Sequence, residues 1–236
     1  MKRIYFDIET GPLPEKELLA MLPPFDPAEV KTGNLKDPAK VAEKIAEARE
    51  NHQRDFIERA ALDPLTGRVL AIGVLRVTPA YDDHAGELNR EPADLAGEFS
   101  VIAHDDEKTL LCYFWAMVRG DHGRLNPLIG FNSNLFDLPF LIRRSWKHGV
   151  SIPGGIRRGR YWGDQVIDIR DCWQLGDRMA KGSLASIAKH FGLGDKAGSG
   201  KDFAALWKSN PDAAIAYLRQ DLNLTKAIAD KLGVVA

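Results

Sequence analysis

Large aliphatic or aromatic residues recur at every second position near the start of the chain. They are Ile4, Phe6 and Ile8. Because neighbouring side chains of a strand point to opposite faces, this alternation predicts a strand over residues 3–9 whose apolar face is buried. Asp7 and Glu9 then share the other face, and the Gly-Pro pair at 11–12 ends the strand just beyond them.

Later parts of the chain show further strand patterns and, between them, helical patterns. Short apolar runs predict strands near residues 68–78, 98–104, 127–131 and 165–169. Apolar residues at helical spacing predict helices near residues 106–119, 135–148, 182–191 and 211–232. Strands come first and alternating helix-strand units follow, an order typical of a mixed α/β fold.

A carboxylate lies at the expected start of the helix over 135–148. An apolar strand leads into a polar turn that contains Asn132, and Asp137 falls in the first turn of the helix that follows. Gly149 is a typical residue for the C-terminal end of that helix. For an isolated aspartate, favourable interaction with the helix macrodipole would be a sufficient explanation.

A tyrosine and an aspartate lie four residues apart on the last predicted helix. Asn210 is a good N-cap and Pro211 suits the first helical position. Tyr217 and Asp221 then project from one face about one turn apart. A half-buried tyrosine beside a solvated aspartate is the structural alternative.

Each of these patterns recurs by chance in a chain of this length. A second Asp-x-Glu lies at residues 105–107, where we interpret it as the acidic start of a helix. The three segments become specific only in combination and in this order. They are Asp7-Ile8-Glu9-Thr10, then Gly130-Phe131-Asn132 with Phe136-Asp137-Leu138-Pro139, then Tyr217-x-x-x-Asp221.

In this order the segments resemble the three motifs of the DEDD (DnaQ-like) 3′-5′ exonuclease superfamily. The tyrosine is similar to that of the superfamily's tyrosine branch, and the likeness is greatest to the proofreading exonuclease domain of B-family DNA polymerases. The resemblance implies a ribonuclease H-like fold, an α/β fold with a mixed five-stranded sheet flanked by helices. It also implies an enzyme, a phosphodiester hydrolase that shortens nucleic acid from the 3′ end.

The resemblance further implies two Mg²⁺ or Mn²⁺ ions held by Asp7, Glu9, Asp137 and Asp221. Oxygen ligands alone suit these hard cations and exclude a typical zinc site. Two such ions would activate a water and stabilise the departing 3′ oxygen, so that 5′ mononucleotides leave a single-stranded end, DNA being favoured. Tyr217 would orient the water, because a phenol is mostly protonated at pH 7 and makes a poor base. Asp168 falls where this group often has a strand-borne acid, but we expect it to contact the ligands at most and not the ions.

By the same resemblance, the terminal nucleotides would contact Thr10, Asn132 and Phe136. Two basic segments are further candidates for strand binding. The helix after Asp137 carries Arg143, Arg144, Lys147 and His148, and the glycine-rich segment over 154–163 carries Arg157, Arg158 and Arg160 among aromatic residues. Arginines beside aromatic rings suit contacts to the nucleic-acid backbone and stacking on bases, although a solvated loop is the alternative.

About fifty-five residues separate the first strand from the second, too many for an ordinary loop. Prolines are frequent at the start of this stretch, and residues 38–61 have the pattern of a charged helix. Its few large apolar residues are Val41, Ile45, Phe56 and Ile57. We expect a partly helical insertion over about residues 12–66, either a lid that guides the strand or a helix packed on the body.

Length and charge bound the remaining choices. The 236 residues, 44% of them hydrophobic, suffice for one domain over 1–236. A net charge of -1 argues against a duplex-binding protein with a broad basic face, but not against an enzyme that holds a few nucleotides. We expect a cytoplasmic protein, since no signal peptide, membrane span or cysteine motif is present.

No polymerase module is recognisable, so the enzyme would be free-standing or supplied with a polymerase or repair partner in trans. Its own partner would be the 3′ end of single-stranded DNA or RNA. Two alternatives remain open at this point. One is an RNA-directed or endonucleolytic enzyme of the same fold. The other is a catalytically silent nucleic-acid-binding protein, which the electrostatic cost of an idle carboxylate cluster argues against.

Overall fold

A computed structural model describes residues 2–78, 97–120, 125–154, 156, 165–177, 179–194 and 203–234. The chain divides into two compact units. The first comprises Met1–Glu9 and Val69–Ala236, and the second is Thr10–Arg68. The insertion expected over about residues 12–66 lies inside the second unit.

Five strands form one mixed sheet with the order β3-β2-β1-β4-β5. They are β1 (Arg3–Pro12), β2 (Gly67–Val77), β3 (Glu98–Ala103), β4 (Leu128–Gly130) and β5 (Val166–Asp168). β4 is parallel to both β1 and β5, whereas β2 and β3 are antiparallel. The predicted α/β class with a mixed five-stranded sheet is therefore confirmed.

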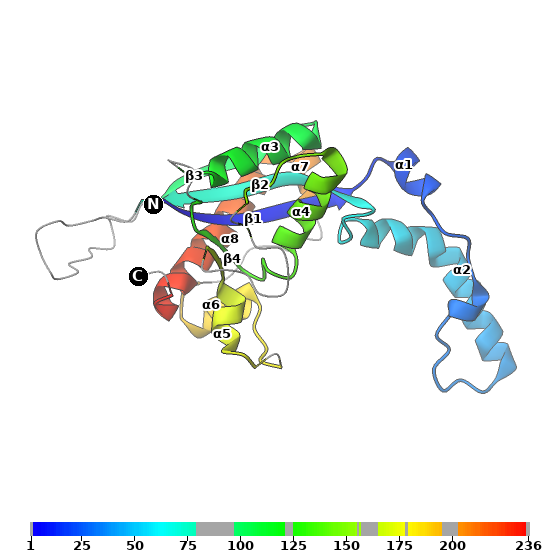
Figure 1. The fold of residues 1–236 in the computed structure, drawn as a ribbon. Helices are drawn as coiled ribbons and strands as arrows, with labels where there is room; N and C mark the ends of the chain where they lie inside the picture. Colours follow the sequence, from blue (N-terminus) through cyan, green and yellow to red (C-terminus); the bar gives the residue numbers. More distant parts are fainter. Residues whose placement is uncertain are drawn as a thin grey trace, which may run out of the picture. The chain divides into compact units, whose positions relative to one another are not determined.

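Two helices, α3 (Glu107–Val118) and α4 (Asp137–His148), cover one face of the sheet (Figure 1). The core there combines the alternate apolar residues of β1 with apolar residues of both helices: Ile4, Phe6, Ile8, Leu110, Phe114, Leu138 and Leu141. The burial predicted for the apolar face of the first strand is therefore confirmed.

The opposite face is covered by α5 (Ile169–Gln174), α6 (Leu184–His190), α7 (Phe203–Ser209) and α8 (Pro211–Leu232). Tyr5 of β1 packs there with Leu222 and Ile228 of α8. Ala71 of β2 packs with Leu218 of the same helix. The sheet is thus the middle of three layers, and β1 contributes its two faces to two different cores.

The second unit contains α1 (Glu15–Ala20), a 3-10 turn at Pro27–Glu29 and α2 (Pro38–Ala60). Asp37 caps α2 by accepting a 3.0 Å hydrogen bond from the backbone N–H of Ala39. A small core joins α1 to the end of α2 through Leu13, Leu18, Ala60, Phe56 and Ile57. The charged helix expected over 38–61 is confirmed, while the choice between a lid and a packed helix stays a prediction.

The four helices and five strands expected from periodicity are all present, and their ends lie within two residues of the predicted ones except at the end of β1. That strand was expected to end at residue 9 and continues through the Gly-Pro pair to Pro12. Sequence reasoning missed the short helices α1, α5 and α7, which have six or seven residues each. Such helices are shorter than the window over which helical periodicity can be recognised. None of the described helices has the length and apolar character needed to cross a membrane.

Candidate active site

The first two predicted ligands lie toward the end of β1. Glu9 is buried and Asp7 is half-buried. Both share the strand face of Tyr5, which α8 covers. The strand pattern therefore places two carboxylates on the sheet face that also receives the helix carrying Tyr217 and Asp221.

Asp137 begins α4 and lies against β1. Its Oδ1 accepts a 3.0 Å hydrogen bond from the backbone N–H of Ile8, the residue between Asp7 and Glu9. Burial raises the pKa of Asp137 to about 7, against the lowering effect of the Ile8 N–H, and the charge of Asp168 raises it further. The first and second motifs, 129 residues apart, thus meet at one hydrogen bond.

The loop before Asp137 is held by Asp168, the last residue of β5. Asp168 Oδ1 accepts from the backbone N–H of Asn132 at 2.8 Å, and Oδ2 accepts from that of Asn134 at 2.8 Å. A third N–H, from Arg170, donates to Oδ1 at 2.9 Å. Asp168 is buried and therefore supports the loop that leads to Asp137.

Close packing at the start of this loop involves Gly130. A Cβ on Gly130 would lie 2.6 Å from Cβ of Ser133 and 2.7 Å from its Oγ. Contacts this short are not tolerated, so only glycine fits at the end of β4 while the loop keeps its path. The glycine of the second motif thus has a steric role in placing Asp137.

The third motif lies on α8, which packs tightly on β2. A Cβ on Gly73 would be 3.1 Å from Cδ1 of Leu222 and 3.2 Å from Cδ2 of Leu218. Asp221, beside Leu222, is 4% exposed. Tyr217, one turn earlier, is partly buried with its ring 6.2 Å from that of Phe203. The close helix-strand approach at Gly73 therefore fixes the depth of the third motif.

The structure brings the first and second motifs together through the hydrogen bond from Ile8 to Asp137. Within the described ranges, no three His, Cys, Asp or Glu side chains form a group able to hold a metal ion. Convergence of Asp7, Glu9 and Asp221 on Asp137 therefore stays a prediction.

The predicted substrate contacts are placed as follows. Phe136 is partly buried, with its ring 5.6 Å from that of Phe140. Asn132 is also partly exposed and precedes Asp137 by five residues. Thr10 donates a 2.6 Å hydrogen bond from its hydroxyl to the carbonyl of Ala61 within the second unit. Three arginines lie outside the described residues: Arg157, Arg158 and Arg160.

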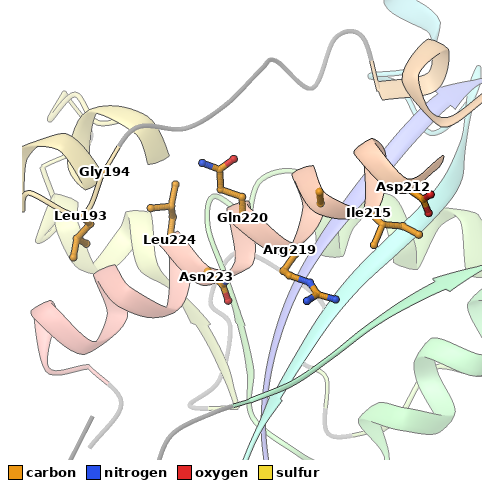
Figure 2. Close-up of a pocket in the computed structure, with 9 residues that line it drawn as sticks. Leu193, Gly194, Asp212, Ile215, Arg219, Gln220, Asn223 and Leu224 are labelled. Carbon is orange, nitrogen blue, oxygen red and sulfur yellow. The ribbon is translucent and has the colours of Figure 1, made fainter. Parts of the chain in front are cut away.

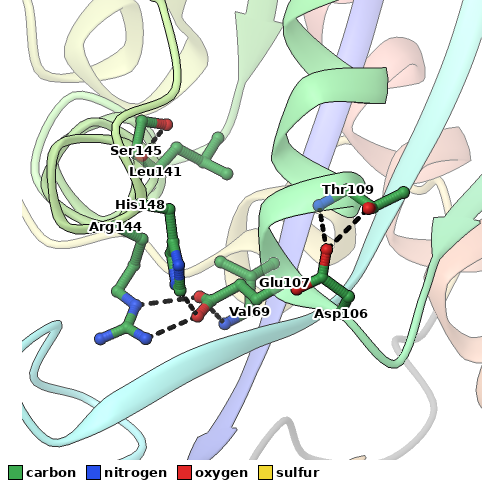
Figure 3. A network of polar contacts seen from close by, with 8 residues as sticks. All are labelled: Val69, Asp106, Glu107, Thr109, Leu141, Arg144, Ser145 and His148. Atoms are coloured by element: carbon green, nitrogen blue, oxygen red, sulfur yellow. Dashed lines mark hydrogen bonds and ion pairs between the residues drawn. The ribbon is translucent and has the colours of Figure 1, made fainter.

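The basic patch expected on α4 is only partly correct. Arg144 is 1% exposed and donates to Glu107 from Nε at 2.9 Å and from Nη2 at 2.5 Å. His148 Nε2 lies 2.9 Å from Glu107 Oε2, and the backbone N–H of Val69 donates to Oε1 at 2.9 Å (Figure 3). Arg144 and His148 thus join α4 to α3 and β2, because the helix turns these two positions inward.

The remaining basic residues of α4, Arg143 and Lys147, are exposed, as is Trp146 between them at 56%. Spacings of three and four residues put them on one side of the helix. This exposed side of α4, formed by Arg143, Trp146 and Lys147, replaces the patch expected from sequence.

The second Asp-x-Glu lies where the sequence placed it, at a helix start. Asp106 caps α3 by accepting a 2.9 Å hydrogen bond from the N–H of Thr109 (Figure 3). Glu107 follows in the first turn and is buried in its pairing with Arg144. Its structural role had no local signal, since its partner is 37 residues away.

An open groove of about 590 Å³ runs along α8 on a side that includes neither Tyr217 nor Asp221 (Figure 2). Its lining is mixed in chemistry: Leu193, Gly194, Asp212, Ile215, Ala216, Arg219, Gln220, Asn223 and Leu224. Among the described residues that line the groove, Asp212 is the carboxylate, and none is an acidic residue of the three motifs.

Comparisons with known proteins agree with this arrangement. Among solved structures, the family B DNA polymerase from the hyperthermophilic archaeon Pyrobaculum calidifontis is similar, with a TM-score of 0.58 and 17% sequence identity. The likeness covers 98% of this chain and 24% of the polymerase chain, so this chain spans about a quarter of that protein. It concerns the fold alone and agrees with the predicted ribonuclease H-like architecture. No curated protein sequence gives a significant match.

A family profile described as "Predicted 3'-5' exonuclease related to the exonuclease domain of PolB" matches residues 68–225. The matched range begins after Asp7 and Glu9 and contains Asp137, Tyr217 and Asp221. It covers about two thirds of the chain. The chain therefore belongs to the family of predicted 3′-5′ exonucleases related to the exonuclease domain of PolB, and its enzyme class is that of a phosphodiester hydrolase.

Proposed function

We propose that this protein is a metal-dependent 3′-to-5′ exonuclease that releases 5′ mononucleotides from single-stranded nucleic-acid ends, with DNA as the favoured substrate. The observation that supports this most is the hydrogen bond from Ile8 to Asp137, which joins the first two motifs of the family. The family match supports the direction of cleavage, since its description names a 3′-5′ exonuclease.

Asp7, Glu9, Asp137 and Asp221 would hold two Mg²⁺ or Mn²⁺ ions. The donor set fits, because carboxylate oxygens are the ligands these cations prefer. Burial raises the pKa of Asp137 to about 7, and a bound cation would favour its ionised form. When bound, two ions would lower the pKa of the attacking water and stabilise the departing 3′ oxygen.

The tyrosine of the third motif has a separate role in the proposal. Tyr217 lies one helical turn from Asp221, so its hydroxyl and that carboxylate can reach the same water. A phenol is protonated at neutral pH and therefore orients the water through hydrogen bonding rather than removing its proton.

The strand would be held by groups that tolerate any sequence. Asn132 and Phe136 lie in the loop and turn just before Asp137, and we retain Thr10 as a third contact to the terminal nucleotides. The exposed side of α4 carries two cations for phosphates and the Trp146 ring for base stacking. We also retain Arg157, Arg158 and Arg160 as strand-binding residues. Their joint replacement would reduce the salt dependence of strand binding, and an unchanged slope would remove them from the proposal.

The test is a cleavage assay with 5′-labelled single-stranded DNA and RNA in Mg²⁺, Mn²⁺ or EDTA. We expect a metal-dependent ladder that shortens from the 3′ end and is absent for Asp7→Ala and Asp221→Ala. Asp212→Ala is the matched control, because Asp212 is an exposed aspartate at the start of the same helix. Wild-type turnover by Asp7→Ala or Asp221→Ala would refute the proposal.

The other outcomes separate the alternatives. Faster shortening of RNA than of DNA would identify an RNA-directed enzyme. Cleavage of a circular single strand would identify an endonuclease, because a circle offers no 3′ end. Binding without any cleavage would identify a catalytically silent nucleic-acid-binding protein.

A further inference from the structure

The side chain of Asn132 is held by Arg170, the second residue of α5. Nη1 of Arg170 donates a 2.7 Å hydrogen bond to Oδ1 of Asn132. A guanidinium group has donors and no acceptor, so the contacted amide atom must be the carbonyl oxygen. The Nδ2 group of Asn132 therefore points away from Arg170 with two N–H donors.

Among the described residues, no group accepts a hydrogen bond from this Nδ2. Asn132 is partly exposed and lies in the loop that leads to Asp137. Its donors are thus available at the surface, five residues before a predicted ligand. An amide fixed in this way can bind an acceptor and cannot turn to bind a donor.

The backbone of Asn132 is held by the same short segment. Its φ of 60° lies in the left-handed region, which asparagine adopts more readily than most residues. Asp168 stabilises this conformation by accepting from the N–H groups of Asn132 and Asn134. Residues 168–170 therefore fix the main chain and the side chain of Asn132 together.

We propose that Arg170, with Asp168, orients the amide of Asn132 so that Nδ2 donates a hydrogen bond to a backbone oxygen of the substrate strand. Arg170 is then a positioning residue for strand binding. This inference rests on the proposed function in one respect: it takes a single nucleic-acid strand as the ligand. Its chemistry is that of a fixed donor matched to phosphate or sugar oxygens, which every nucleotide carries.

The test is the affinity for a fluorescein-labelled oligothymidine, measured by anisotropy in EDTA so that no cleavage is needed. Asn132→Gly keeps access to the positive φ and loses the amide. Asn132→Asp keeps an acceptor for Arg170 and loses both donors. Arg170→Met removes the orienting group. We expect each to raise Kd by about 3-fold to 10-fold, the range for loss of one hydrogen bond.

A double-variant cycle separates positioning from direct contact. In the Asn132→Gly background, Arg170→Met should weaken binding no further, because the group it orients is absent. Losses that multiply would mean that Arg170 contacts the strand itself, and they would overturn the inference. Wild-type affinity of Asn132→Gly would overturn it too, since asparagine would then serve the backbone alone. Arg76→Met is the matched control, because Arg76 pairs with Glu98 on β2 and β3.

Cleavage kinetics give a second readout. The Asn132 and Arg170 variants should raise KM and leave kcat within about twofold, as expected when binding common to ground and transition states is lost. A protein that shows this coupling in binding but cleaves nothing would refute the proposed function and leave this inference intact. Cleavage without the coupling would refute the inference alone, and a wild type that neither binds nor cleaves the strand would refute both.

Discussion

The backbone N–H of Ile8 donates a 3.0 Å hydrogen bond to Oδ1 of Asp137, the first residue of α4. Ile8 lies between Asp7 and Glu9 of β1. The hydrogen bond from its N–H therefore fixes the N-terminal end of α4 beside the first motif. The side chain of Ile8 packs in the core under α3 and α4, while its backbone N–H binds Asp137. This bond therefore joins β1 and α4, the two elements that carry Asp7, Glu9 and Asp137.

Replacing Asp137 by asparagine should abolish cleavage and keep this hydrogen bond, since the amide carbonyl can accept it. The same variant should change how stability depends on pH in EDTA. The pKa of Asp137 in the folded protein, about 7, lies above its ordinary value of 3.8. The folded state therefore binds this proton more tightly, and the carboxyl lowers stability as the pH rises from about 4 to about 7.

Urea unfolding at several pH values in EDTA would measure this effect. Asp137→Asn should lose the decrease and be more stable than the wild type at pH 8. Parallel pH profiles for the two proteins would contradict the assigned pKa, even if cleavage were lost.

Arg144→Met should destabilise the protein by roughly 3–5 kcal/mol, because it leaves Glu107 buried without its main partner (Figure 3). Arg143→Met, one position earlier and exposed, should change the free energy of unfolding by about 0.5 kcal/mol or less. Chemical denaturation of the two variants makes the comparison. Equal effects would mean that the pairing with Glu107 contributes little.

Glu107 should make the protein sensitive to acid. Burial alone would raise its pKa, but hydrogen bonds from Arg144 and Val69 outweigh it and hold the pKa below the ordinary value of 4.5. The folded state therefore binds this proton less tightly than the unfolded chain does. The resulting stability is fully present above pH about 4.5 and is lost as the pH falls below it. Glu107→Gln should flatten this acid limb in thermal unfolding, and an unchanged limb would assign the sensitivity to other groups.

Gly130→Ala should displace the loop that leads to Asp137, since its Cβ would meet Ser133 at 2.6 Å. We expect a loss of about 1–3 kcal/mol, typical of overpacking, together with reduced cleavage. Adding Ser133→Gly should restore much of the stability by removing the clashing atoms. Gly154→Ala is the control, because a Cβ there meets nothing within 4 Å. A Gly130→Ala variant as stable as the control would show that the loop yields easily.

Tyr217→Phe should slow cleavage by about 10-fold to 100-fold, because the water would lose a hydrogen bond that orients it. Metal binding should persist, since the phenol is no proposed ligand. Titration of Mn²⁺ by calorimetry and single-turnover cleavage would measure the two properties separately. An unchanged rate would remove Tyr217 from the mechanism.

The sequence by itself determined the longer helices, the strands and the motifs. The alternation of Ile4, Phe6 and Ile8 with Asp7 and Glu9 is a local property, and it set the burial of the three apolar residues and the common face of the two acids. The caps at Asn210 and Gly233 bound α8 for the same reason, since a helix end depends on neighbouring residues.

Only the tertiary structure decided which distant groups meet. The partner of Asp137 is a main-chain N–H 129 residues earlier, and no side-chain pattern marks a backbone donor. Arg144 and Arg143 are alike in sequence, yet the rotation of α4 buries one against Glu107 and exposes the other. Contacts between residues so far apart in the sequence depend on how the helices pack on the sheet. Local periodicity does not predict that packing.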